Sequence, residues 1–112
     1  MALPSSSRTW GWVPSVELHG MTLGVLGLGV IGEGVARRAA AFGMQVIGTE
    51  SDTGSYRGVA AAVYPPTETL EVFRRADAVV ITLPGGDATR HLVGGAELEA
   101  LRGGWLVNVG RG

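Results

Sequence analysis

The stretch Thr22–Gly32, which reads TLGVLGLGVIG, sets the architecture that we expect for this chain. Its first five residues are short and apolar, as a buried strand would be. Three glycines follow in the spacing G-x-G-x-x-G, at Gly27, Gly29 and Gly32. Apolar positions then recur at helical spacing, at Ile31, Val35, Ala39 and Phe42. We therefore predict a helix over residues 30–42, which begins inside the glycine turn and ends at a glycine.

Each glycine of this turn answers a separate physical need. Gly27 permits the tight turn, Gly29 lets a pyrophosphate approach the backbone, and Gly32 lets the helix pack closely on the strand. The backbone N–H groups of Val30 and Ile31 would face the phosphates at the positive end of the helix dipole. The glycine spacing alone is a weak signal, but between a strand and a helix it predicts a dinucleotide-binding turn.

The rest of the chain alternates predicted strands with predicted helices. Further strands are expected at Gln45–Thr49, 59–63, 78–83 and 105–109. Thr69 is expected to cap a short helix, and residues 87–101 to be mostly helical. This alternation implies parallel strands joined by right-handed crossovers. The predicted fold is therefore α/β, a Rossmann-like doubly wound parallel sheet of about five strands that lacks the last elements of the usual fold.

Length and composition limit the alternatives. With 112 residues, 46% hydrophobic and 17% charged, the chain suits one packed domain at 21–112 after an N-terminal arm at 1–20. A net charge of −1 gives no reason to expect a nucleic acid or an anionic membrane as partner. Neither a secretory signal nor a membrane-spanning run is evident, so a cytoplasmic location is expected. His19 and His91 lack metal-ligand spacing, and no metal is expected.

An acidic residue is expected at the end of the second strand, where it would bind the adenosine ribose hydroxyls. Glu50 directly follows the predicted strand at Gln45–Thr49, about 20 residues beyond the glycine turn. Its charge would repel a 2′-phosphate, so NAD is predicted in preference to NADP. Asp52 is a second candidate for this role, and Arg57 would favour NADP if its loop folds back.

Three ordered segments resemble the D-isomer-specific 2-hydroxyacid dehydrogenases. Residues 17–50, ELHGMTLGVLGLGVIGEGVARRAAAFGMQVIGTE, are similar to the start of the cofactor domain in that family. Residues 76–94, ADAVVITLPGGDATRHLVG, resemble its fourth strand and the Leu-Pro loop that follows. Residues 101–112, LRGGWLVNVGRG, resemble the strand that ends in Asn-x-x-Arg-Gly. The resemblance implies an oxidoreductase that transfers hydride between NAD and a small D-2-hydroxy acid or 2-oxo acid.

The resemblance also implies roles for the matching positions. Arg111 would be the catalytic arginine, because a guanidinium can bind the carboxylate of a 2-oxo acid and polarise its carbonyl. Leu83 and Pro84 would contact the adenosine half of the cofactor, and Thr89 would lie at the start of the next helix. The positions that would approach the nicotinamide are Asn108, Val109 and Gly110.

The family's enzymes also need a histidine proton donor, a carboxylate that orients it, and a second domain that closes over the substrate. These elements lie outside the matched segments. We therefore expect these 112 residues alone to bind NAD weakly and not to turn over a 2-oxo acid. The resemblance does not fix the 2-hydroxy acid. The apolar strand at 105–109 would leave an unpaired edge, so a homo-oligomer is expected.

Two other functions stay open. The first alternative is a non-catalytic module that binds NAD(H). The second is another nucleotide-cofactor fold with a similar turn, such as a binder of S-adenosylmethionine or S-adenosylhomocysteine, and the segment NVGRG at 108–112 argues against it.

Overall fold

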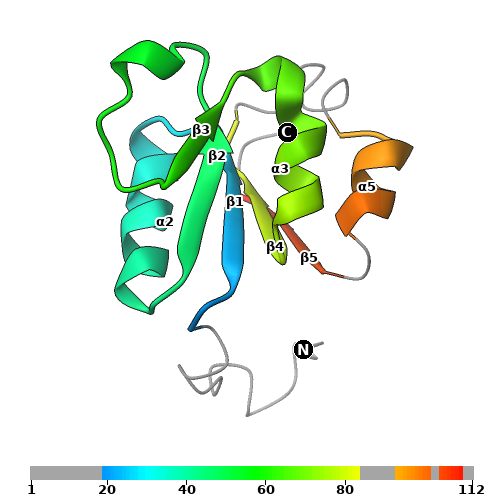
Figure 1. Ribbon diagram of the computed structural model, residues 1–112, viewed down its shortest axis with the longest axis horizontal. Coiled ribbons are helices and arrows are strands. Elements are labelled where there is room, and N and C mark those ends of the chain that lie inside the picture. The colour runs from blue at the N-terminus through cyan, green and yellow to red at the C-terminus, as the bar shows by residue number, and fades with distance from the viewer. Residues whose placement is uncertain (1–18, 84–92, 102–103, 110–112) are drawn as a thin grey trace.

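The computed structural model describes residues 19–83, 93–101 and 104–109. They form a five-stranded sheet in the order β3-β2-β1-β4-β5, and every neighbouring pair of strands is parallel (Figure 1). The predicted α/β, doubly wound parallel sheet is confirmed. The strands are β1 (Thr22–Leu26), β2 (Gln45–Thr49), β3 (Ala62–Tyr64), β4 (Ala78–Ile81) and β5 (Trp105–Asn108). The helices are α2 (Val30–Ala41), α3 (Thr69–Arg75) and α5 (Gly95–Leu101), with short 3-10 turns at Thr53–Ser55 and Pro66–Glu68.

The central strands β1, β2 and β4 are covered on both faces, which explains why they are apolar almost throughout. Leu23 and Val25 of β1 belong to a buried cluster with Ala36 of α2. Leu26 belongs to the opposite cluster, which includes Phe73 of α3 and side chains of β4 and α5. Figure 1 shows the same arrangement, with α2 on one side of the sheet and α3 and α5 on the other.

Helix α2 begins and ends close to its predicted bounds, but only Val35 and Ala39 of its predicted apolar positions pack into the core. Ile31 and Phe42, which set the predicted apolar spacing, are 62% and 53% exposed. The buried positions are all small, at Gly32, Ala36 and Ala39. Small residues let the helix backbone approach the sheet, whereas large apolar side chains at the same depth would hold it away. Close approach therefore decides the buried face of α2.

Two predicted boundaries near the third strand are wrong. The strand was expected at 59–63 but lies at Ala62–Tyr64, because the Val59 N–H donates to a carboxylate of α2 instead of joining the sheet. Thr69 is the first residue of α3 and not its cap, a position that Glu68 takes. The Thr69 hydroxyl donates to the carbonyl oxygen of Pro66 at 2.7 Å, which closes the preceding turn.

The predicted helix at 87–101 lies only partly within the described residues, where α5 forms its last seven residues. The strand predicted at 78–83 ends at Ile81, and the one predicted at 105–109 ends at Asn108. Among the helices of the described residues, none is long and apolar enough to cross a membrane.

Candidate cofactor site

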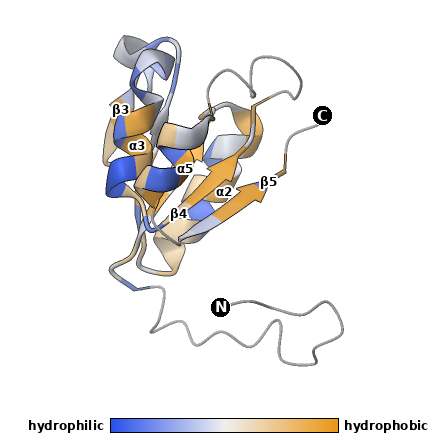
Figure 2. Ribbon diagram, turned by 90° about the vertical axis from the view of Figure 1, so that its right-hand side faces the viewer, coloured by the Kyte–Doolittle hydropathy of each residue, from blue (hydrophilic) through white to orange (hydrophobic). Residues whose placement is uncertain are grey.

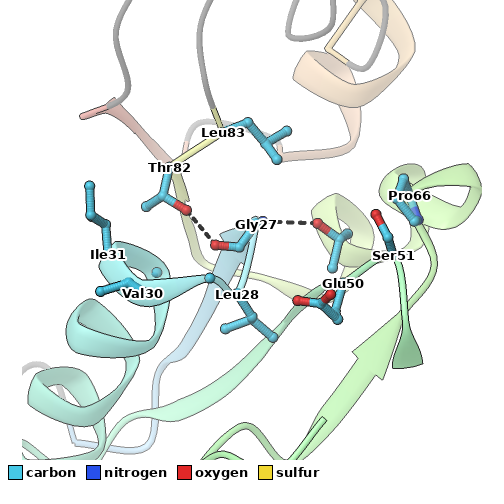
Figure 3. Close-up of a pocket in the computed structure, with 12 residues that line it drawn as sticks. Gly27, Leu28, Val30, Ile31, Glu50, Ser51, Pro66, Thr82 and Leu83 are labelled. Atoms are coloured by element: carbon cyan, nitrogen blue, oxygen red, sulfur yellow. Dashed lines mark hydrogen bonds between the residues drawn. The ribbon is translucent and has the colours of Figure 1, made fainter. Parts of the chain in front are cut away.

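A hollow of about 370 Å³ lies at the carboxyl ends of β1, β2 and β4 (Figure 3). Parallel sheets of this kind bind ligands at that edge, where the strand order reverses direction. Here the reversal falls at β1, which has β2 on one side and β4 on the other. The lining residues are Gly27, Leu28, Gly29, Val30, Ile31, Gly32, Thr49, Glu50, Ser51, Pro66, Thr82 and Leu83.

The glycine turn forms one wall of the hollow, and its three glycines differ in their surroundings. Gly27 has a φ of +98°, in the left-handed region that favours glycine. A Cβ on Gly32 would overlap the carbonyl oxygen of Gly27, so the helix starts in close contact with the turn. A Cβ on Gly29 would meet no atom within 4 Å. The turn is therefore packed at its two ends and open in the middle.

The open middle of the turn coincides with the start of α2. Gly29 is the N-terminal cap, and its carbonyl accepts the first helical hydrogen bond, from the Glu33 N–H at 2.8 Å. The N–H groups in the first turn of a helix have no partner within that helix. Val30, whose side chain is 93% exposed, leaves this end of α2 uncovered. Together the N–H groups and the helix dipole favour a negatively charged group in the hollow.

Two threonines that the sequence analysis did not single out hold the turn in place (Figure 3, dashed lines). Thr49 ends β2 and accepts a hydrogen bond from the Gly27 N–H at 3.0 Å. Thr82 follows β4, and its hydroxyl lies 2.9 Å from the carbonyl oxygen of Leu26 and 2.6 Å from that of Gly27. A polar residue at the carboxyl end of an apolar strand was the available signal for both, because β2 and β4 end at the hollow.

Glu50 lies where the sequence places it, directly after β2, and lines the hollow (Figure 3). Its backbone N–H donates to the carbonyl oxygen of Tyr64 at 3.0 Å, which fixes the chain beside β3. Its carboxylate accepts a hydrogen bond from the Asp52 N–H at 3.3 Å. Asp52 itself is exposed and is not part of the lining, so Glu50 is the acid that faces the hollow.

The structure describes only some of the positions named by resemblance. Leu83 lines the hollow and lies over the turn, where its Cδ2 would be 2.8 Å from a Cβ on Gly27. Asn108 ends β5 opposite Ile81, and the Val109 N–H donates to the Ile81 carbonyl oxygen at 3.0 Å. Both follow the sheet edge but are not part of the lining. The predicted positions outside the described residues are Pro84, Thr89, Gly110 and Arg111.

The residues of the hollow fit a dinucleotide. Gly29 leaves room for a pyrophosphate against the backbone, the start of α2 supplies N–H donors, and the Glu50 carboxylate can accept hydrogen bonds from a ribose diol. Leu83 and Pro66 add apolar surface near the opening (Figure 3).

Comparison with known proteins agrees with this geometry. Residues 5–112 match the model of the family described as D-isomer specific 2-hydroxyacid dehydrogenase, NAD binding domain. The chain is 43% identical over 108 residues to a glyoxylate reductase of Aeropyrum pernix, a match that covers 91% of this chain and 32% of that protein. It is 36% identical over 98 residues to a D-3-phosphoglycerate dehydrogenase of Methanocaldococcus jannaschii, covering 87% of this chain and 19% of the other.

A solved structure shows the same similarity. The phosphoglycerate dehydrogenase from Lactobacillus plantarum superposes with a TM-score of 0.74 at 30% sequence identity. That match covers 99% of this chain and 33% of the other. The chain thus spans about a third of the length, or less, of the relatives that it matches.

Proposed function

The chain belongs to the D-isomer specific 2-hydroxyacid dehydrogenase family, in its NAD binding domain, and from this premise we propose the activity that it serves. We propose that it is the NAD(H)-binding portion of an oxidoreductase that acts on a small D-2-hydroxy acid or 2-oxo acid. The bound nicotinamide would donate or accept the hydride. The residues of this chain would bind the cofactor, orient it and bind the carboxylate of the substrate.

The observation that carries the proposal is the shape of the glycine turn. The turn is packed at Gly27 and Gly32 and open at Gly29, and the open part faces the N–H groups at the start of α2. Glu50 lines the same hollow from the end of β2, where an acid can bind the ribose of a dinucleotide.

The substrate side of the site follows from family membership. The glyoxylate reductase and the D-3-phosphoglycerate dehydrogenase among the relatives both act, by their names, on short 2-oxo or 2-hydroxy acids. Arg111 is the proposed catalytic residue, since its guanidinium can bind a carboxylate through two hydrogen bonds and stabilise charge on the adjacent carbonyl oxygen. The cofactor contacts proposed beside it are Leu83, Pro84, Thr89, Asn108, Val109 and Gly110.

Calorimetric titration of the chain with NAD+ tests the proposal, with S-adenosylhomocysteine and NADP+ as competitors. We expect NAD+ to bind, and S-adenosylhomocysteine to leave that binding unchanged, because it has no pyrophosphate for the turn. NADP+ is expected to bind more weakly than NAD+. Binding of S-adenosylhomocysteine in place of NAD+ would contradict the proposal and favour another nucleotide-cofactor fold.

A homo-oligomer is also proposed. Strand β5 pairs only with β4 within the described sheet, and the apolar side chains of Trp105, Leu106 and Val107 are 40–46% exposed. Figure 2 shows the hydrophobic colour of β5 along the middle of the strand, at the border of the sheet. Exposed apolar edges favour pairing with another chain. Sedimentation velocity at micromolar concentration should detect dimers or larger species, and a single monomeric species would contradict this. The cytoplasmic location stays a prediction.

A further inference from the structure

A second hollow lies directly beside the cofactor site. Its volume is about 280 Å³, and it shares Leu28 and Glu50 with the first hollow. Its remaining lining residues are Glu33, Ser55, Tyr56 and Arg57. The proposed function places the adenosine ribose against the Glu50 carboxylate. A group attached to the 2′ oxygen of that ribose would then extend past Glu50 into the second hollow. The second hollow is therefore the place where a 2′-phosphate would have to fit.

The loop that walls this hollow is tied to α2 by a hydrogen-bonded cluster. The Tyr56 hydroxyl donates to Glu33 Oε1 at 2.6 Å, and the Val59 N–H donates to Glu33 Oε2 at 3.0 Å. The Ala60 N–H donates to the Tyr56 hydroxyl at 3.0 Å. A Cβ on Gly58 would overlap the Tyr56 hydroxyl and both carboxylate oxygens, so the cluster is closely packed. The Glu33 carboxylate is thus held in one orientation, between the loop and the first turn of α2.

The charges around the hollow are predominantly negative. Glu33 and Glu50 both line it, against the single guanidinium of Arg57. Arg57 Nη1 donates to the carbonyl oxygens of Gly54 and Tyr56 at 3.2 and 2.7 Å, so this end of the guanidinium is directed onto its own loop. The other cation near Glu33 is Arg37, one turn further along α2, at 3.6 Å and largely exposed.

Glu33 is ionised at neutral pH. Partial burial raises the pKa of its carboxyl, but the hydrogen bonds from Tyr56 and the Val59 N–H and the charge of Arg37 together outweigh burial. The net pKa lies below the ordinary value of 4.5. A phosphate that carries between about −1.5 and −2 charges would therefore face two carboxylates in the second hollow.

We propose that Glu33, held in place by Tyr56, is a second determinant of selectivity for NAD over NADP, because its carboxylate repels a 2′-phosphate at the hollow beside Glu50. Two carboxylates repel the phosphate from different sides: Glu50 from the end of β2 and Glu33 from the first turn of α2. Tyr56 acts as a positioning residue, since it fixes the direction of the Glu33 carboxylate without carrying charge itself. This inference rests on the proposed function.

The test is calorimetric titration of NAD+ and NADP+ into the chain and three variants. Glu33→Gln removes the charge and keeps the shape, Tyr56→Phe removes the hydrogen bond and keeps the charge, and Glu71→Gln is the control. Glu71 is a partly exposed acid on α3, on the opposite side of the sheet from α2, and its replacement by glutamine makes the same change in net charge as Glu33→Gln. Each ratio of the two dissociation constants reports selectivity without depending on the absolute affinity.

We expect Glu33→Gln to strengthen NADP+ binding roughly fivefold to tenfold and to change NAD+ binding less than about twofold. Tyr56→Phe should shift the ratio in the same direction by a smaller factor, and Glu71→Gln should leave it unchanged. High salt should reduce the effect of Glu33→Gln, because ions screen repulsion between partly exposed charges.

The failures of the two ideas are distinguishable. If the unaltered chain binds neither dinucleotide, the proposed function is contradicted, and this inference with it. If NAD+ binds but the ratio in Glu33→Gln equals that of the unaltered chain or of Glu71→Gln, the inference alone is overturned. An unchanged ratio in Tyr56→Phe would contradict the positioning role of Tyr56.

Discussion

The glycine turn has two sides that differ in almost every respect. On the inner side, Gly32 touches the backbone of Gly27, and the hydroxyls of Thr49 and Thr82 bond to Gly27 from the two neighbouring strands. On the outer side, Gly29 has no neighbour within 4 Å of an added Cβ. One short motif therefore has two roles: its inner side packs against the rest of the fold, and its outer side leaves space for a ligand.

Substitutions on the two sides should therefore affect different properties, stability on the inner side and NAD binding on the outer side. A change on the inner side should lower the free energy of unfolding, because it disturbs packed backbone. A change on the outer side should leave that free energy nearly unchanged and weaken NAD binding. The predictions below test this contrast.

The largest effect on stability is expected for Gly32→Ala. The added methyl would overlap the carbonyl oxygen of Gly27 and contact the Thr82 hydroxyl, and backbone cannot move aside as a side chain can. We expect a loss of about 3 kcal/mol or more in the free energy of unfolding, measured by urea denaturation. Gly34→Ala is the matched control in the same helix, because its Cβ would meet only the Arg38 side chain at 3.4 Å. That control should gain up to about 1 kcal/mol.

A smaller loss in the free energy of unfolding is expected for Thr49→Val, which keeps the shape of the side chain and removes its hydroxyl. Thr49 is 3% exposed, and its hydroxyl oxygen accepts the hydrogen bond of the Gly27 N–H. The substitution leaves that donor without this partner, which costs about 1–3 kcal/mol in the free energy of unfolding. Thr49→Ser restores the acceptor and should recover most of the loss. Equal destabilisation by valine and serine would show that the hydrogen bond does not hold the turn.

The smallest effect on the free energy of unfolding is expected for Glu33→Gln, and it depends on pH. Because hydrogen bonds and Arg37 lower the pKa of the Glu33 carboxyl in the folded chain, its ionised form stabilises the fold. That contribution is complete above the ordinary value of 4.5 and is lost as the pH falls through the lowered pKa. Urea denaturation should find Glu33→Gln less stable than the unaltered chain at neutral pH, with the gap narrowing in acid. A gap that stays constant into acid would rule out ionisation as its source.

Much of the outer side of the turn could be predicted from sequence. The strand, the glycine spacing, the helix and the acid at Glu50 all lie within one short segment, and local patterns report each of them. The described positions Gly27, Gly29, Val30, Ile31, Gly32, Glu50 and Leu83 all line the hollow. Their roles as cofactor contacts stay predictions.

The inner side was harder to predict, because its contacts join residues far apart in the chain. Thr82 meets Gly27 only after the sheet has formed, and Tyr56 reaches Glu33 across a loop. The latter contact also explains the misplaced third strand, since it draws Val59 away from the sheet. Periodicity predicted helix α2 correctly but marked its largest apolar residues, Ile31 and Phe42, whereas the residues buried against the sheet are small.

The most direct test of the account is Gly29→Val, with NAD+ affinity and unfolding measured on the same preparation. Gly29 has a negative φ of −87° in the extended region, and a Cβ at this position would enter open space. We predict that NAD+ binding weakens by roughly 100-fold or more, equivalent to about 3 kcal/mol, while the free energy of unfolding changes by no more than about 1 kcal/mol. NAD+ binding of undiminished affinity in Gly29→Val would contradict the claim that this turn holds the pyrophosphate.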